Sequence, residues 1–366
     1  MNNSVFIKIS AFFFFYFAAT AVFVVFFPKV MQMTGYTPTQ IGIIFSITPL
    51  MRFLLPFLFL KLFKLTKKIY YTALVFSFFA VLSFYITIHN FYLFIISNIL
   101  LGLCLSIILP FVETHALGYL KKERFGRARL FGSLGFMITG IILARNLDTY
   151  IVGIHYLSIS AFLVLISGIL AIESENRRNE ISDNIEKFEF GKTLLLWISL
   201  FLNQMSFGIF YNFFTLYETQ RGISLETVSY LWAFSIICEM LFFYFQTPLL
   251  KKFNLIHLIM IGVFFTMIRW LILYMFPSSL PMLYLSQSLH AIGFALHHTA
   301  AISYLYKIYK QKKLASQFYY GLSFGLGGFL GSIFAGFLYG KYIFLYAAII
   351  SMLSFIALIN QPKQNF

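Results

Sequence analysis

The chain has 366 residues, of which 60% are hydrophobic and 11% charged, and its mean hydropathy is +0.85. A soluble domain of this length is excluded, because so few polar side chains could not cover its surface. The net charge of +15 would ordinarily suggest nucleic-acid binding, but the cations lie at the ends of apolar stretches, where anionic lipid headgroups attract them. We therefore expect membrane lipids, and no nucleic acid, as partners.

Twelve apolar stretches follow one another along the chain. Each reaches or nears the ~20 residues that a helix needs to cross the hydrocarbon core of a bilayer. We expect spans near residues 5–27, 38–60, 69–88, 91–117, 128–147, 151–172, 192–217, 225–249, 255–276, 281–305, 315–339 and 342–359. The first is too long for the apolar part of a signal peptide and is interpreted as an uncleaved span. The sequence predicts an all-α membrane protein with twelve transmembrane helices.

The cations indicate an orientation. Twenty of the 27 Lys and Arg residues fall on one side of the expected spans, and four fall on the other side: Lys29, Arg145, Arg221 and Lys341. Short loops rich in Lys and Arg stay in the cytoplasm. We expect a multi-pass protein of the bacterial inner membrane with both termini in the cytoplasm.

The one sustained polar stretch, residues 173–190, holds six of the 12 acidic residues. We interpret it as a cytoplasmic linker between an N-terminal six-helix bundle, residues 1–172, and a C-terminal one, residues 191–366. A shift of 187 positions puts Arg52 over Glu239, and a shift of 185 puts Glu113 over His298. Two pseudo-symmetric six-helix halves joined by a cytoplasmic loop are the plan of major facilitator transporters.

Ionisable side chains inside the spans are the functional candidates, because a charge in hydrocarbon is costly. They are Arg52, Glu113, His115, Arg129, Glu239, Arg269, His290, His297 and His298. Glu239 and Glu113 are the candidate proton carriers. Arg52 and Arg269 would attract a substrate carboxylate or tune a nearby acid. Glu218 lies near the outer end of the seventh span, where solvation is its simplest interpretation.

The second and eighth spans would bring Arg52 and Glu239 together if the halves meet there. A pair that forms in one state and breaks in another would couple protonation to movement of the halves. The alternative is a static buried ion pair that fixes helix packing.

Three histidines lie within two turns of the tenth span. His290 and His297 are seven residues apart and would share a face. They and His298 are interpreted as a proton relay or substrate contact, with plain interhelical hydrogen bonding and metal binding as alternatives. Because no ligand spacing is found among the other histidines, we expect neither a metal nor a cofactor.

Uncharged polar and small residues complete the candidates. Asn203 and Gln204, in the seventh span, could hold a substrate or hydrogen-bond neighbouring helices. The fifth and eleventh spans are rich in glycine and are interpreted as packing surfaces where the halves slide. These glycines include Gly132, Gly135, Gly327 and Gly331.

Several motifs together resemble a known family. Residues 125–136, FGRARLFGSLGF, are similar to the YGRIRLWGSIGF signature of 3-phenylpropionate-type permeases of the major facilitator superfamily. The signature residues are Arg127, Arg129, Gly132 and Gly135, and further matches are Arg52, Trp232, Glu239, Arg269, Trp270, Gln287, His290 and His298. Phe131 stands where the family usually has Trp, and the loop 61–68 lacks the superfamily's Gly…Asp-Arg motif. The resemblance implies proton symport.

The combined prediction is a secondary active transporter that takes up a small organic solute with protons by alternating access. An aromatic acid such as 3-phenylpropionate is favoured, and a sugar or nucleoside is the alternative. Substrate would bind between the halves, in a cavity lined by the first, fourth, seventh and tenth spans. A monomer is expected. A membrane-embedded enzyme or a sensor is the alternative of another class.

Overall fold

The computed structural model describes residues 3–61, 66–120, 122–172 and 191–361, and within these ranges all regular structure is helical. The chain divides into two compact units. Unit 1 consists of Met1–Asn179 with Ser224–Ala233, and unit 2 consists of Glu180–Ile223 with Phe234–Phe366. The linker predicted at residues 173–190 lies outside the described residues.

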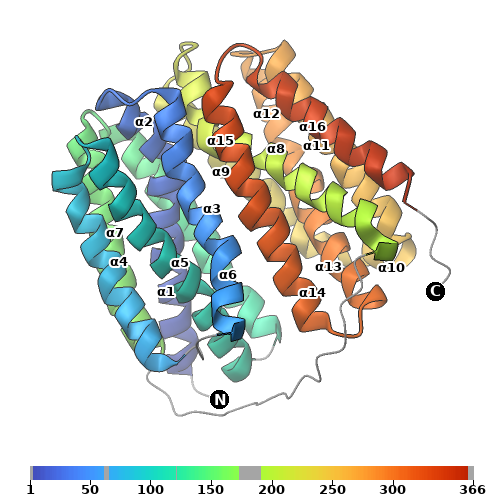
Figure 1. Ribbon diagram of the computed structural model, residues 1–366, viewed down its shortest axis with the longest axis horizontal. Helices are drawn as coiled ribbons and strands as arrows, with labels where there is room; N and C mark the ends of the chain where they lie inside the picture. Colours follow the sequence, from blue (N-terminus) through green and yellow to red (C-terminus); the bar gives the residue numbers. More distant parts are fainter. Residues whose placement is uncertain (1–2, 62–65, 121, 173–190, 362–366) are drawn as a thin grey trace. The chain divides into compact units, whose positions relative to one another are not determined.

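Unit 1 holds the helices of the first six spans. They are α1 (Asn3–Ala21), η1 (Val22–Phe26), α2 (Phe27–Met33), α3 (Pro38–Lys61), α4 (Lys67–Thr87), α5 (Phe91–Tyr119), α6 (Lys122–Asn146) and α7 (Tyr150–Ala171). The side chains of Thr66 and Asn90 cap α4 and α5 by accepting hydrogen bonds from backbone N–H groups of the first turn. Helix α1 packs against α6 and α7, and α4 packs against α5 and α7 (Figure 1).

Unit 2 repeats this plan. Its helices are η2 (Gly191–Thr193), α8 (Leu194–Thr219), α9 (Leu225–Phe245, from Phe234 onward), α10 (Thr247–Lys252), α11 (Leu255–Met275), α12 (Leu280–Ser288), η3 (Ala291–Leu296), α13 (His297–Ile308), α14 (Lys312–Tyr319), η4 (Tyr320–Gly327), α15 (Gly328–Phe337) and α16 (Ile343–Ile359). Helix α8 packs against α15 and α16, and α11 packs against α12, α13 and α16. Thus the first span of each unit contacts the fifth and sixth, and the third contacts the fourth and sixth.

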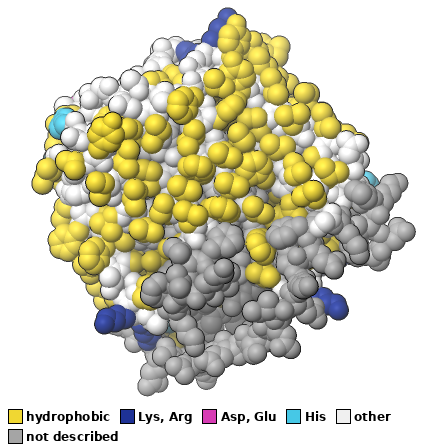
Figure 2. All heavy atoms as spheres, viewed as in Figure 1, with side chains coloured by type: hydrophobic (Ala, Val, Ile, Leu, Met, Phe, Trp, Pro, Cys, Tyr) yellow, Lys and Arg dark blue, Asp and Glu magenta, His cyan; other side chains and the backbone are white. Residues whose placement is uncertain are grey.

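Every predicted span corresponds to a helical segment. Ten helices in the described part are long and apolar enough to cross a membrane. The last predicted span is the 17-residue helix Ile343–Ile359, and the tenth is divided into α12, η3 and α13. Hydrophobic side chains cover much of the face in view, with Lys and Arg side chains near its margins (Figure 2). The prediction of an all-α, multi-pass membrane protein is confirmed.

The glycine-rich stretches bring helices of the same unit into close contact. A Cβ on Gly135 of α6 would lie 2.1 Å from the backbone oxygen of Phe14 in α1, and one on Gly331 of α15 would lie 2.3 Å from that of Met205 in α8. Gly327 likewise meets α8, and a Cβ on Gly132 would meet the Phe17 ring at 2.5 Å. These glycines therefore form packing surfaces within each unit, as expected, and the expectation that the halves slide there stays a prediction.

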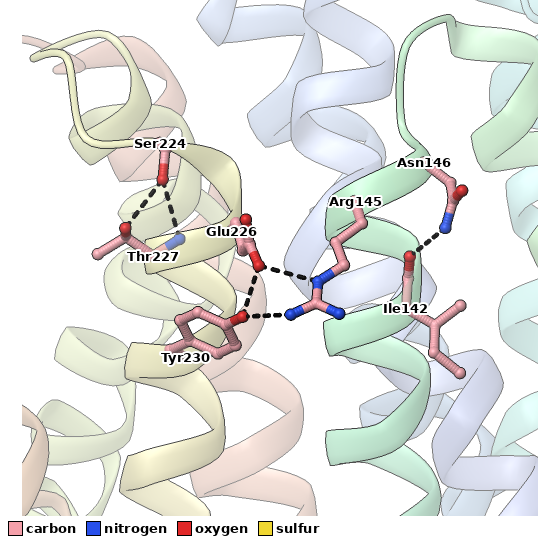
Figure 3. A network of polar contacts seen from close by, with 7 residues as sticks. All are labelled: Ile142, Arg145, Asn146, Ser224, Glu226, Thr227 and Tyr230. Carbon is pink, nitrogen blue, oxygen red and sulfur yellow. Dashed lines mark hydrogen bonds and ion pairs between the residues drawn. The ribbon is translucent and has the colours of Figure 1, made fainter.

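Helix α9 takes part in both units. Its first turns are fixed to the end of α6, because Arg145 donates through Nε to Glu226 Oε1 at 2.9 Å and through Nη2 to the hydroxyl of Tyr230 at 2.8 Å. Tyr230 in turn donates to the same carboxylate oxygen at 2.5 Å (Figure 3). From Phe234 onward α9 belongs to unit 2. One continuous helix therefore connects the two units.

Candidate functional site

A chain of buried polar side chains runs across three helical segments of unit 2. Arg269 of α11 donates through Nη1 to Nδ1 of His290 at 2.9 Å, and His290 Nε2 lies 3.3 Å from Glu239 Oε2 of α9. Arg269 is fully buried, and the side chains of His290 and Glu239 are 6% and 20% exposed. The structure thus brings together three of the predicted site residues.

The hydrogen bonds define the protonation of the ring. A guanidinium can only donate, so Nδ1 of His290 must accept and cannot carry a hydrogen. The remaining nitrogen, Nε2, then carries the hydrogen and donates to Glu239. A neutral imidazole therefore stands between a permanent cation and an acid that can gain or lose a proton.

Arg269 is held by further contacts that sequence reasoning did not assign. Its Nη2 donates to Gln287 Oε1 at 2.9 Å, and its guanidinium carbon lies 4.1 Å from the ring centroid of Phe210 and 4.6 Å from that of Trp270. Its Nε has no hydrogen-bond partner among the described residues. These contacts, together with its full burial, hold the guanidinium of Arg269 in place beside His290.

The three histidines have different surroundings. The rings of His290, Phe294 and His298 stack, with Phe294 inclined by 4° and 10° to its two neighbours. His297 instead contacts Asn203 of α8, at 3.4 Å from its amide nitrogen. The π-helical segment η3 lies between His290 and His297 and winds more widely than an α-helix, which changes the face that each residue presents. The spacing of seven residues therefore does not give His290 and His297 common partners.

The neutral polar residues of α8 divide between two roles. Asn203 is fully buried and serves as an interhelical partner of His297. Gln204, 6% exposed, makes no hydrogen bond among the described residues. The amide oxygen of Asn203 also has no hydrogen-bond partner among the described residues, so both side chains keep polar atoms that a ligand could use.

In unit 1, Glu113 of α5 forms an ion pair with Arg129 of α6, and both also lie near Tyr16 of α1. Arg129, a residue of the family signature, is therefore in direct contact with the candidate proton carrier Glu113. The sequence did not predict this contact. Arg52 of α3 is half-buried and also influences Tyr16, but no ion pair of Arg52 is found in the described part of the chain. Arg127 is exposed.

Some predicted contacts stay predictions. Arg52 lies in unit 1 and Glu239 in unit 2, and the pairing proposed between them remains a hypothesis. Trp232 contacts Phe136 of α6, with ring centroids 6.2 Å apart. Trp270 donates to Ser206 of α8 at 3.0 Å.

The sequence analysis named Gln287 as a motif match without giving it a role, and it missed two tyrosines that the structure places at these sites. Gln287 lies three residues before His290, so helical periodicity could have placed both on one face. Tyr211 lies near Glu239 and Arg269, and Tyr16 near Arg52 and Glu113. A lone tyrosine in a chain with 23 of them gives no sequence signal of its own.

Two six-helix units of the same plan, with a small polar cluster buried inside apolar helices, define a transporter of the major facilitator class. The chain belongs to the MFS_1 like family, which it matches over residues 6–355. This membership confirms the resemblance found in the sequence motifs, and transporters rather than enzymes make up the family and its structural neighbours.

Two curated relatives are similar to this chain. A "Probable 3-phenylpropionic acid transporter" of Escherichia coli K12 is 24% identical over 358 residues, which cover 93% of each chain. The "Uncharacterized transporter YwbF" of Bacillus subtilis 168 is 27% identical over 256 residues, 68% of this chain, and the match spans 63% of that relative's length.

Solved structures show the same fold at low identity. The nucleoside transporter NupG superposes with a TM-score of 0.80 at 15% identity, and the match covers all of both chains. A D-xylose-proton symporter gives a TM-score of 0.71 at 10% identity over 98% of each chain.

Proposed function

We propose that this protein is a secondary active transporter that carries a small organic solute into the bacterial cell together with a proton, with an aromatic acid such as 3-phenylpropionate as the favoured cargo. The observation that carries the proposal is the buried chain Arg269–His290–Glu239. Buried ionisable groups are expensive in a membrane protein and mark ion or proton pathways.

In the proposed mechanism Glu239 binds the transported proton. When Glu239 is ionised, the N–H of His290 donates to a charged acceptor, and such hydrogen bonds are about twice as strong as neutral ones. Protonation of Glu239 removes that charge and weakens the contact between α9 and the tenth span. Because α9 begins in unit 1 and carries Glu239 in unit 2, a change at Glu239 reaches both units through one helix.

An aromatic acid would need a cation and apolar surface. Arg52 is half-buried and has no ion pair in the described part of the chain, whereas Arg269 is fully buried and already bonded to His290 and Gln287, so Arg52 is the better candidate for a substrate carboxylate. The similarity to the probable 3-phenylpropionic acid transporter of Escherichia coli, which covers 93% of each chain, supports this substrate class.

A sugar or nucleoside is the second candidate. The neutral amide of Gln204, which makes no hydrogen bond within the described residues, could bind a hydroxyl group. Two solved structures of the same fold, a nucleoside transporter and a D-xylose-proton symporter, support this alternative.

The test is uptake by energised vesicles across a panel of aromatic acids, sugars and nucleosides, with and without a protonophore. We expect accumulation of an aromatic acid that the protonophore abolishes. Arg52→Gln should reduce that uptake more than Gln204→Leu does, and the reverse order would identify a neutral substrate. Accumulation that persists without a proton gradient would overturn proton coupling.

A further inference from the structure

Glu218 is a buried acid that the proposed transport site does not use. It lies in the last turn of α8, is fully buried, and neither carboxylate oxygen has a hydrogen-bond partner among the described residues. The interpretation of Glu218 as a solvated residue is therefore wrong. A buried carboxylate without partners is far more costly than the neutral acid.

The hydroxyl groups beside Glu218 point elsewhere. Tyr339 lies close enough to interact with Glu218 electrostatically, but its hydroxyl donates to Gln220 Oε1 at 2.6 Å. Tyr217, the preceding residue, donates its hydroxyl to the backbone oxygen of Lys341 at 3.4 Å. Neither phenol supplies the hydrogen bond that an ionised carboxylate would need.

The neighbouring cation is also engaged. Arg221 donates through Nη1 to the backbone oxygen of Tyr217 at 2.9 Å, and its guanidinium carbon lies 3.3 Å from the centroid of that tyrosine ring. Arg221 and the backbone amide of Ser278 also face Glu218. Because a fully buried carboxylate without a side-chain hydrogen-bond partner is costly, we infer that Glu218 carries a proton.

The residues that neighbour Glu218 come from separate parts of unit 2. Ser278, in the connection between α11 and α12, is the one non-glycine residue of the described chain with a positive φ, 68°. Its hydroxyl donates to the backbone oxygen of Arg221 at 3.4 Å. Strained backbone of this kind persists where surrounding contacts hold it, and it is concentrated at functional sites.

Helix α8 relates this site to the transport cluster. Gln204, Tyr211 and Glu218 are spaced by seven residues and so lie along one face of the helix. Tyr211 is near Glu239 and Arg269, and Glu218 follows it by about 10 Å along the helix axis.

We propose that Glu218 is a second proton-binding site of unit 2, separate from Glu239, at the end of α8 opposite to the linker. Its proton is exchangeable and sits on the helix face that leads to Tyr211. The role of this proton in transport rests on the proposed function. The presence of the proton on Glu218 is independent of that function.

The direct test is infrared spectroscopy of the purified full-length protein in lipid, titrated with pH. The wild type should show a protonated-carboxyl C=O band that disappears on alkalinisation, and Glu218→Gln should lack it. Asp148→Asn is the matched control, because Asp148 is an exposed acid, and it should keep the band. Spectra that are identical in the wild type and Glu218→Gln would overturn the proposal, as would a band that responds to sodium instead of pH.

Two further variants keep the test decisive. If Glu218→Gln does not fold, Glu218→Asp must shift the frequency or the titration midpoint of the band, and an unchanged band would contradict the assignment. Glu239→Gln should keep the Glu218 band. If Glu239→Gln removes no pH-dependent carboxyl band from the spectrum, the proposed role of Glu239 is contradicted. The assignment of the other band to Glu218 is unaffected by that result.

Discussion

At the residue scale, Arg269 illustrates how one side chain organises a site. It makes two directed hydrogen bonds, to His290 and Gln287, while three aromatic rings surround its guanidinium: Phe207, Phe210 and Trp270. Lysine is a compact point charge and cannot reproduce that planar fork.

We therefore expect Arg269→Lys to reduce proton-coupled uptake by roughly 10- to 100-fold, since a lost hydrogen bond to a charged group is worth about 1.5–3 kcal/mol. Uptake at saturating solute, compared with exchange of labelled for unlabelled solute, measures the effect. Arg124→Lys, at a half-buried arginine outside the cluster that donates to Asn3, is the control and should remain near wild type. Equal activity of the two variants would show that Arg269 has no positioning role.

The sequence predicted which residues matter better than how they pair. Glu239, Arg269 and His290 were identified because ionisable residues in hydrocarbon are rare. Their contact could not be predicted, because it depends on how α9, α11 and the tenth span pack. Glu218 was misjudged for the same reason: its position near a helix end suggested water, but the side chain is fully buried, with Arg221 and Ser278 beside it.

At the element scale, glycine determines how closely helices approach. Alanine at Gly135 would place its Cβ 2.1 Å from a backbone oxygen of α1, which cannot move aside as a side chain could. A Cβ at Gly126, also in α6, would meet nothing within 4 Å.

We expect Gly135→Ala to destabilise the protein by about 1–3 kcal/mol, the usual cost of overpacking. Gly126→Ala should be neutral or stabilising, because alanine is favoured over glycine in a helix by about 0.5–1 kcal/mol. Thermal unfolding in detergent, followed by circular dichroism, compares the two. Equal unfolding temperatures would contradict the close approach of α6 to α1.

The contact between α6 and the start of α9 provides an electrostatic prediction. Arg145→Glu should weaken the attachment of α9, because it places two carboxylates together, and exchange of the charges in Arg145→Glu with Glu226→Arg should restore it. A double-mutant cycle on unfolding temperature at low salt measures this coupling. Purely additive effects would show that the pair seen in Figure 3 does not hold α9.

At the scale of the whole molecule, composition and charge were sufficient to predict the membrane-spanning helices and their division into two halves. Hydrophobic stretches predicted the helical segments, because each span must satisfy its own backbone hydrogen bonds in lipid. The interruptions at η1, η3 and η4 were not predictable, because they depend on contacts with neighbouring helices. Similar spacing of ionisable residues indicated two halves, and the repeated packing of each unit agrees with two similar bundles.

The distribution of cations predicts that both termini face the cytoplasm. A tag at either end should be inaccessible to a membrane-impermeant reagent in intact cells, and a tag inserted beside Asp148 should be accessible. Labelling in intact and permeabilised cells checks this orientation. Accessible termini in intact cells would reverse the orientation.

The central claim, that solute moves with a proton bound at Glu239, is tested most directly by recording internal pH in proteoliposomes when a transported solute is added outside. The wild type should acidify the interior as solute enters. Glu239→Gln should exchange solute but produce no acidification, because its side chain cannot carry the proton. Acidification by Glu239→Gln equal to that of the wild type would contradict the account.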